Sequence, residues 1–176
     1  ILTTENIKGF EKRIFFDNKI LQCKTHFPAG RALQFYAQFF AQVRQEASTD
    51  FFWEGLRSIE LPSDCERLPT FDLALFAEAR GYRNGGSISN IKESMFDLNS
   101  FLQGLVYSLA KSFAGEINQF QPIIGPEVLL IGKMARIIPA FAQLLGELTR
   151  RKVQLVEQDH EASLLGLSHL SKRQEP

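Results

Sequence analysis

Residues 128–170 constrain the fold more than any other stretch, because two strand-like runs alternate there with two helical ones. The continuous apolar run at 128–131 is typical of a strand buried on both faces, so we expect a central, parallel strand. Pro139 suits the first turn of the helix that follows, and 153–156 predicts the next strand. Asp159 can cap a final helix. This alternation of strands and helices favours an α/β fold.

The first part of the chain predicts a hairpin followed by an amphipathic helix. Residues 13–16 and 20–25 are short β-favouring runs, and the Asp-Asn-Lys sequence at 17–19 is typical of a turn, so two antiparallel strands are expected. From Gly30 the apolar residues recur every three or four positions, which predicts a helix. Its expected buried face consists of Leu33, Tyr36, Phe40 and Val43.

Two prolines, Pro62 and Pro69, interrupt the stretch between residues 51 and 80, so no long element is expected there. We predict one short helix near 52–57, with loops around it. Residues 87–91 then predict a short strand.

The clearest helix of the chain follows, and Asp97 or Asn99 can cap its start. Helical spacing places its apolar residues on one wide stripe, which consists of Leu98, Phe101, Leu102, Leu105, Val106, Leu109 and Phe113. Together, these elements predict a mixed sheet with helices on both faces.

Composition limits the class of protein and its partners. A chain of 176 residues with 44% hydrophobic residues favours one soluble domain, at 1–171, before a polar tail at 172–176. Lys plus Arg and Asp plus Glu are both 20, so no general attraction to nucleic acid or to an anionic membrane is expected. The apolar runs are shorter than the roughly 20 residues that cross a bilayer. Cys23 and Cys65 lack metal-like spacing, which favours a reduced, cytoplasmic protein.

Common catalytic signatures are absent from the sequence, which disfavours P-loop, dinucleotide, serine-hydrolase and zincin functions. His160 and His169 would lie on opposite sides of a helix, so no metal site is predicted. We interpret the acidic residues at 157–161 as stabilisers of a helix N-terminus, and the alternative is that they serve as acid/base catalysts or Mg²⁺ ligands. We interpret the basic residues at 150–152 as the end of a helix, and the alternative is a phosphate site.

Residues 132–136 are the strongest candidate site. They follow a predicted buried strand and precede a helix, and ligands of parallel α/β sheets gather at such turns. An ordinary turn without a ligand is the alternative.

Several segments, taken in order, resemble the carbohydrate kinases of the FGGY family, and most closely the sedoheptulose-kinase-like branch. Their order and spacing carry the resemblance over most of the chain. The segments are Val128-Leu-Leu-Ile-Gly-Lys-Met-Ala-Arg136, Gln143-Leu-Leu-Gly-Glu-Leu148, Lys152-Val153, Glu161-Ala-Ser-Leu-Leu-Gly166, Gly86-Ser-Ile-Ser-Asn-Ile91, Leu102-Gln-Gly-Leu-Val-Tyr107, Phe16-Asp-Asn-Lys19 and Phe27-Pro-Ala-Gly-Arg-Ala32.

The resemblance implies a ribonuclease-H-like (actin-like ATPase) domain at 1–171, which would form the nucleotide-side, C-terminal half of an ATP-dependent sugar kinase. ATP with Mg²⁺ is the implied cofactor. A ketose such as sedoheptulose or xylulose is the implied substrate, and the N-terminal half of the same kinase would hold it. Family relatives also imply a homodimer. The catalytic aspartate of the family lies upstream of Ile1, so we expect this chain alone to transfer no phosphate.

By the same resemblance, Gly132 matches the first glycine of the family's adenosine loop and Ala135 matches its alanine. Lys133 and Met134 stand where the family has further glycines, and the loop is completed by Arg136. The Thr/Ser phosphate turn of the family falls on Thr3 and Thr4. Because Lys133 and Met134 depart from the pattern, a degenerate kinase fold that binds or regulates without catalysis is the alternative function.

Overall fold

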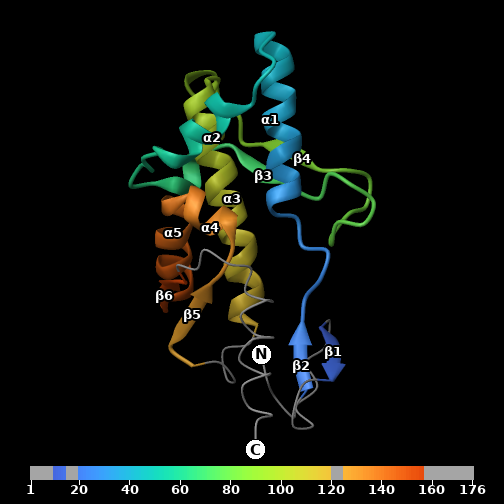
Figure 1. Ribbon diagram of the computed structural model, residues 1–176. Helices are drawn as coiled ribbons and strands as arrows, with labels where there is room; N and C mark the ends of the chain where they lie inside the picture. Colours follow the sequence, from blue (N-terminus) through green and yellow to red (C-terminus); the bar gives the residue numbers. More distant parts are fainter. Residues whose placement is uncertain (1–9, 15–19, 120–124, 157–176) are drawn as a thin grey trace, which may run out of the picture.

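A computed structural model describes residues 10–14, 20–119 and 125–156 of the chain. Within these residues the fold is a mixture of helices and small sheets (Figure 1). The strands are β1 (Glu11–Ile14), β2 (Ile20–Cys23), β3 (Thr70–Asp72), β4 (Ser87–Ser89), β5 (Glu127–Leu130) and β6 (Lys152–Leu155). The helices are α1 (Gly30–Arg44), α2 (Asp50–Arg57), α3 (Leu98–Asn118), α4 (Lys133–Ile137) and α5 (Pro139–Thr149), with short 3₁₀ turns at Cys65–Arg67 and Glu93–Met95.

Helix α3 is the centre of the described structure, and α5, β3 and α2 all pack against it (Figure 1). The predicted cap is confirmed, because the Asp97 side chain accepts a hydrogen bond from the Ser100 N–H at 2.9 Å. The predicted stripe is also largely buried, and Leu105 and Leu109 have no solvent exposure. Burial of such a stripe, rather than intrinsic propensity, supplies most of the stability of a helix in a folded protein.

Helix α1 has the predicted start, but one residue of its predicted inner face is wrong. Leu33 and Tyr36 are buried as expected, whereas Val43 is 64% exposed. Two small residues, Ala37 and Ala41, are buried instead, and they complete the face of α1 that packs against the core. The helix ends where Gln45 adopts a left-handed conformation with φ of 58°.

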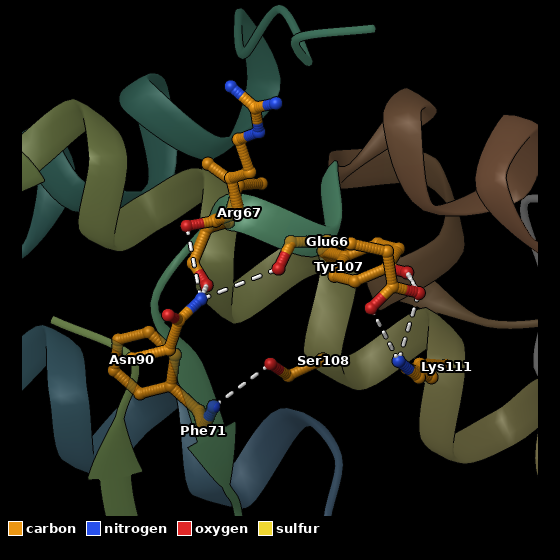
Figure 2. A network of polar contacts seen from close by, with 8 residues as sticks. Glu66, Arg67, Phe71, Asn90, Tyr107, Ser108 and Lys111 are labelled. Atoms are coloured by element: carbon orange, nitrogen blue, oxygen red, sulfur yellow. Dashed lines mark hydrogen bonds and ion pairs between the residues drawn. The ribbon is translucent and has the colours of Figure 1, made fainter. Parts of the chain in front are cut away.

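Strand β3 was not expected, since the sequence around Pro69 predicted only loops. It pairs antiparallel with β4, and Phe71 faces Ile88 in the register. The Phe71 N–H donates a hydrogen bond to Ser108 Oγ of α3 at 2.9 Å (Figure 2). Three residues are too few for a strand to show a periodic pattern, so its packing against α3 defines β3.

Strands β5 and β6 are parallel, as predicted, and α4 and α5 connect them. The expectation that this strand is buried on both faces is wrong. Leu129 is 58% exposed and Ile131 is 56% exposed, so one side of β5 faces solvent in the described structure. Helix α5 starts with Pro139 in its first turn, as predicted.

The described strands form three separate two-stranded sheets. The β1–β2 hairpin is antiparallel, as expected, and lies at the opposite end of α1 from the α1–α2 connection (Figure 1). The prediction of one continuous mixed sheet with helices on both faces is therefore wrong for the described strands. Each pair of strands either packs against its own neighbouring helix or lies at the periphery. None of the helices described is both long and apolar enough to span a bilayer.

Candidate functional site

The turn at Gly132 has the backbone geometry of a position that requires glycine. Its φ is +114° and its ψ is 170°, a combination that side chains other than hydrogen rarely allow. A Cβ atom added there would meet no other atom within 4 Å, so the space in front of the turn is open. The turn follows directly after β5 and begins α4, which has only five residues.

The candidate residues around this turn do not share one environment. Lys133 and Arg136 are exposed, whereas Ala135 is buried. Met134 is half-buried and packs against the hydrophobic core, so its thioether does not fill the space before Gly132. A ligand at the turn would therefore meet the backbone of Gly132 and the side chain of Lys133, but not the side chain of Ala135. Thr3 and Thr4 lie outside the described residues.

The largest of three prominent pockets lies at the other end of β5. Its volume is about 540 Å³, and it opens between the hairpin, the end of α3 and the first residues of β5. Residues 132–136 line none of these three pockets. The pocket is lined by Phe10, Gln22, Lys24, Phe27, Phe113, Glu116, Ile117, Glu127, Val128 and Leu129.

Lys24 and Glu116 both line this apolar pocket and form an ion pair with each other, and both side chains are mostly buried. Burial lowers the pKa of the Lys24 amine, and the neighbouring Arg80 lowers it further. The Lys24 Nζ also lies 4.8 Å from the centroid of the Phe10 ring. Apolar walls with few polar groups are typical of small-molecule sites, and this volume lies in the usual range.

Sequence reasoning missed this pocket. The chain has 16 phenylalanines, which indicate a bulky core but not where a cavity lies within it. Phe27 and Phe113 meet edge to face, with centroids 4.6 Å apart, and they come from segments far apart in the chain. Only the docking of the hairpin against α3 brings them together.

A second, more polar pocket of about 370 Å³ lies beside residues 61–66, α3 and α5. Glu66 at its edge accepts hydrogen bonds from the Tyr107 hydroxyl at 2.5 Å and from Lys111 Nζ at 3.0 Å (Figure 2). The hydrogen bond from Tyr107, followed by the one from Lys111, lowers the pKa of the Glu66 carboxyl. Burial, followed by the hydrogen bond to Glu66, raises the pKa of the Tyr107 hydroxyl. Burial, followed by nearby carboxylates, raises the pKa of the Cys65 thiol in the same pocket, which disfavours the reactive thiolate.

Asn90 holds the segment that carries Glu66. Its Nδ2 donates to the carbonyl oxygens of Leu68 at 2.8 Å and of Arg67 at 3.1 Å (Figure 2). Asn90 itself has φ of 57°, a left-handed conformation that asparagine tolerates better than most residues. The contacts around Glu66 thus join three distant segments of chain, which indicates a structural role for this network.

Over residues 10–14, 20–119 and 125–156, no three His, Cys, Asp or Glu side chains come close enough to hold a metal ion. The acidic residues at 157–161 lie outside those ranges. Neither a protein-family model, nor a curated protein, nor a solved structure matched this chain.

Proposed function

We propose that this chain is the nucleotide-side half of an ATP-dependent carbohydrate kinase with a ribonuclease-H-like (actin-like ATPase) fold. Support comes from the parallel β5–β6 pair and from the helices that connect the two strands. Open α/β structures bind ligands beyond the carboxyl ends of such strands. The order of elements around the pair agrees with the resemblance that the sequence carries.

The observation that carries the proposal is the conformation of Gly132. A positive φ and an open front are what a backbone needs if it is to approach a nucleotide closely. The Met134 side chain packs against the core, so this methionine, which stands where the family has a glycine, does not block a nucleotide from the Gly132 backbone. Ala135 contributes through packing, because its side chain is buried.

Lys133 gives the turn a charge that a glycine would not supply. Its side chain is exposed and directly follows Gly132. In the proposed complex the Lys133 ammonium contacts a phosphate of ATP, since lysine binds phosphate as a flexible point charge. Mg²⁺ would arrive with the nucleotide, bound to its phosphate oxygens.

Phosphate transfer in this proposal needs the N-terminal half of the same kinase. That half would supply the sugar pocket, for a ketose such as sedoheptulose or xylulose, and the aspartate that accepts the proton of the attacking hydroxyl. The chain alone would therefore bind the nucleotide without turning it over.

Calorimetry with ATP and Mg²⁺ tests the proposal on the chain itself. We expect saturable binding, with Kd in the micromolar to millimolar range, or about −8 to −4 kcal/mol. Gly132→Ala should abolish it, because alanine strains the left-handed φ of this turn. Gly125→Ala is the matched control, since its added Cβ also meets open space but its φ is outside the left-handed region.

A non-catalytic kinase-fold module is the second candidate, and Lys133 and Met134 in place of the family's glycines favour it. A folded chain that takes up no ATP at millimolar concentration, even in the presence of its N-terminal half, would contradict the kinase and support this module.

A further inference from the structure

We infer that the apolar pocket between the hairpin, α3 and β5 is a binding site for an uncharged, largely apolar small molecule that carries one hydrogen-bonding group. Its volume of about 540 Å³ falls in the range of about 300 to 1,000 Å³ that is usual for small-molecule sites. The hairpin and β5, which help to form it, lie on either side of the end of α3 (Figure 1). The pocket residues do not include the proposed nucleotide turn, so the inference does not depend on the proposed function.

The apolar walls of the pocket are held in place by the core. Phe113 of α3 meets Phe27 edge to face, and its ring also lies 5.4 Å from that of Phe141, which is 1% exposed. Ile117 and Val128 in the lining pack against the core as well. Side chains that are packed in this way cannot move into the pocket without losing contacts behind them. The walls are therefore in position before a ligand arrives, which lowers the cost of binding.

The pocket opens to solvent at Leu129. This side chain lines the pocket and is 58% exposed. Ile131, the next residue on the same face of the strand, is 56% exposed but is not among the described lining residues. An apolar molecule in the pocket would cover part of Leu129, and removal of apolar surface from water favours such binding.

The charges of the lining are already paired, which selects an uncharged ligand. Lys24 and Glu116 pair with each other, and their side chains are only 13% and 26% exposed. Glu127 pairs with Lys152 at 2.9 Å. Lys24, Glu116 and Glu127 are the charged residues in the described part of the lining. An ionised ligand would lose its hydration without gaining an opposite charge of its own, which is strongly unfavourable in an apolar site.

Gln22 supplies the polar group that can orient a ligand. It lines the pocket and is 3% exposed. The amide of glutamine both donates and accepts hydrogen bonds, so it matches a hydroxyl, carbonyl or amide group. One such contact fixes the orientation, while the rest of the ligand meets the apolar walls. A medium-chain alcohol has this combination of groups, and the corresponding carboxylate places a charge at the same end.

Fluorescence titration with N-phenylnaphthylamine, an uncharged aromatic probe, tests whether the pocket binds. The emission should rise saturably as one probe binds per chain, with a Kd of about 1 to 100 μM. Leu129→Glu should weaken binding at least about tenfold, because it places a carboxylate at the opening of the pocket. Ile131→Glu is the matched control, since Ile131 is almost equally exposed on the same strand, and it should leave the Kd unchanged. Circular dichroism verifies that both variants fold.

Displacement of the probe by decanol and by decanoate at neutral pH tests the class of ligand, and it needs no variant. The wild-type chain should bind decanol at least about tenfold more tightly than decanoate, because only decanoate brings a charge. Glu116→Gln should reduce this preference at least about fivefold, since Lys24 then becomes available as the counter-charge of a carboxylate. A purely structural effect of this variant would change the affinity for both molecules alike.

Four results would overturn the inference. The first is the absence of a saturable rise in emission with about 100 μM chain. Equal weakening by Leu129→Glu and Ile131→Glu would place the probe outside the pocket. Decanoate that binds the wild type as tightly as decanol would contradict an uncharged ligand. An unchanged preference in Glu116→Gln would show that the ion pair of Lys24 and Glu116 does not select the ligand.

Discussion

Replacing Gly104 by alanine should destabilise this protein, although the same change inside a helix normally stabilises it by about 1 kcal/mol. Gly104 lies in α3 where the helix meets the chain just before β3. An added Cβ would lie 2.2 Å from the Pro69 carbonyl oxygen and 2.9 Å from a ring carbon of Phe71. Backbone is the nearest obstacle, so no side-chain rotation can relieve the clash.

The size of the effect follows from what must move. An ordinary carbon–oxygen contact requires α3 and β3 to separate by about 1 Å, and overpacking of this kind costs about 1 to 3 kcal/mol. The same shift strains the buried hydrogen bond from the Phe71 N–H to Ser108, whose loss costs about 1 to 3 kcal/mol. After subtraction of the helix propensity gained by alanine, the expected loss is about 1 to 5 kcal/mol.

Urea unfolding followed by circular dichroism measures this free energy. Gly115→Ala is the matched control, because Gly115 lies in the same helix and an added Cβ there meets nothing within 4 Å. The control should be as stable as the wild type or gain up to about 1 kcal/mol. If Gly104→Ala proves as stable as Gly115→Ala, the close approach of α3 to residue 69 is wrong.

Two further predictions concern the same helix. Asp97→Ala should cost about 1 kcal/mol of unfolding free energy at neutral pH, because the cap to the Ser100 N–H is lost. Hydrogen bonds from the Ser100 hydroxyl and then its N–H lower the pKa of Asp97, so the cap's contribution is complete above the unfolded pKa of about 3.9 and disappears as the pH falls through the folded value. The difference between wild type and Asp97→Ala in urea melts should therefore shrink at acidic pH and persist at pH 7. Ser108→Ala should cost about 1 to 3 kcal/mol, because it leaves the buried Phe71 N–H without an acceptor, while Ser112→Ala on the exposed side should be neutral in the same melts.

The proposed nucleotide turn and the large apolar pocket lie at opposite ends of β5. Gly132 follows the carboxyl end of the strand, whereas Glu127, Val128 and Leu129 line the pocket. Leu129, the pocket residue nearest the turn, precedes Gly132 by three residues, or about 10 Å of strand, so the two places are distinct. Binding at each place can therefore be measured separately, and ATP is expected only at the turn.

The sequence by itself determined the elements whose signals are local. Asp97 marks the start of α3 and Pro139 the start of α5, because capping and a fixed proline φ act within one turn of chain. The glycine at 132 was likewise predictable as a turn, since few other residues adopt its φ. The parallel pairing of β5 and β6 followed from the helices between them, which a parallel connection needs.

Only the tertiary structure decided the features that depend on distant segments. Strand β3 exists because α3 lies close beside it: Ser108 accepts a hydrogen bond from the Phe71 N–H, and Gly104 leaves room for the Pro69 carbonyl. No pattern in the sequence near Pro69 indicates this contact. The exposure of Leu129 was not predictable from the apolar run at 128–131. Hydrophobicity indicates a tendency to be buried, but it does not identify the segment that covers the residue. The apolar pocket and the separation of the described strands into three pairs are consequences of packing, and packing is a property of the whole chain.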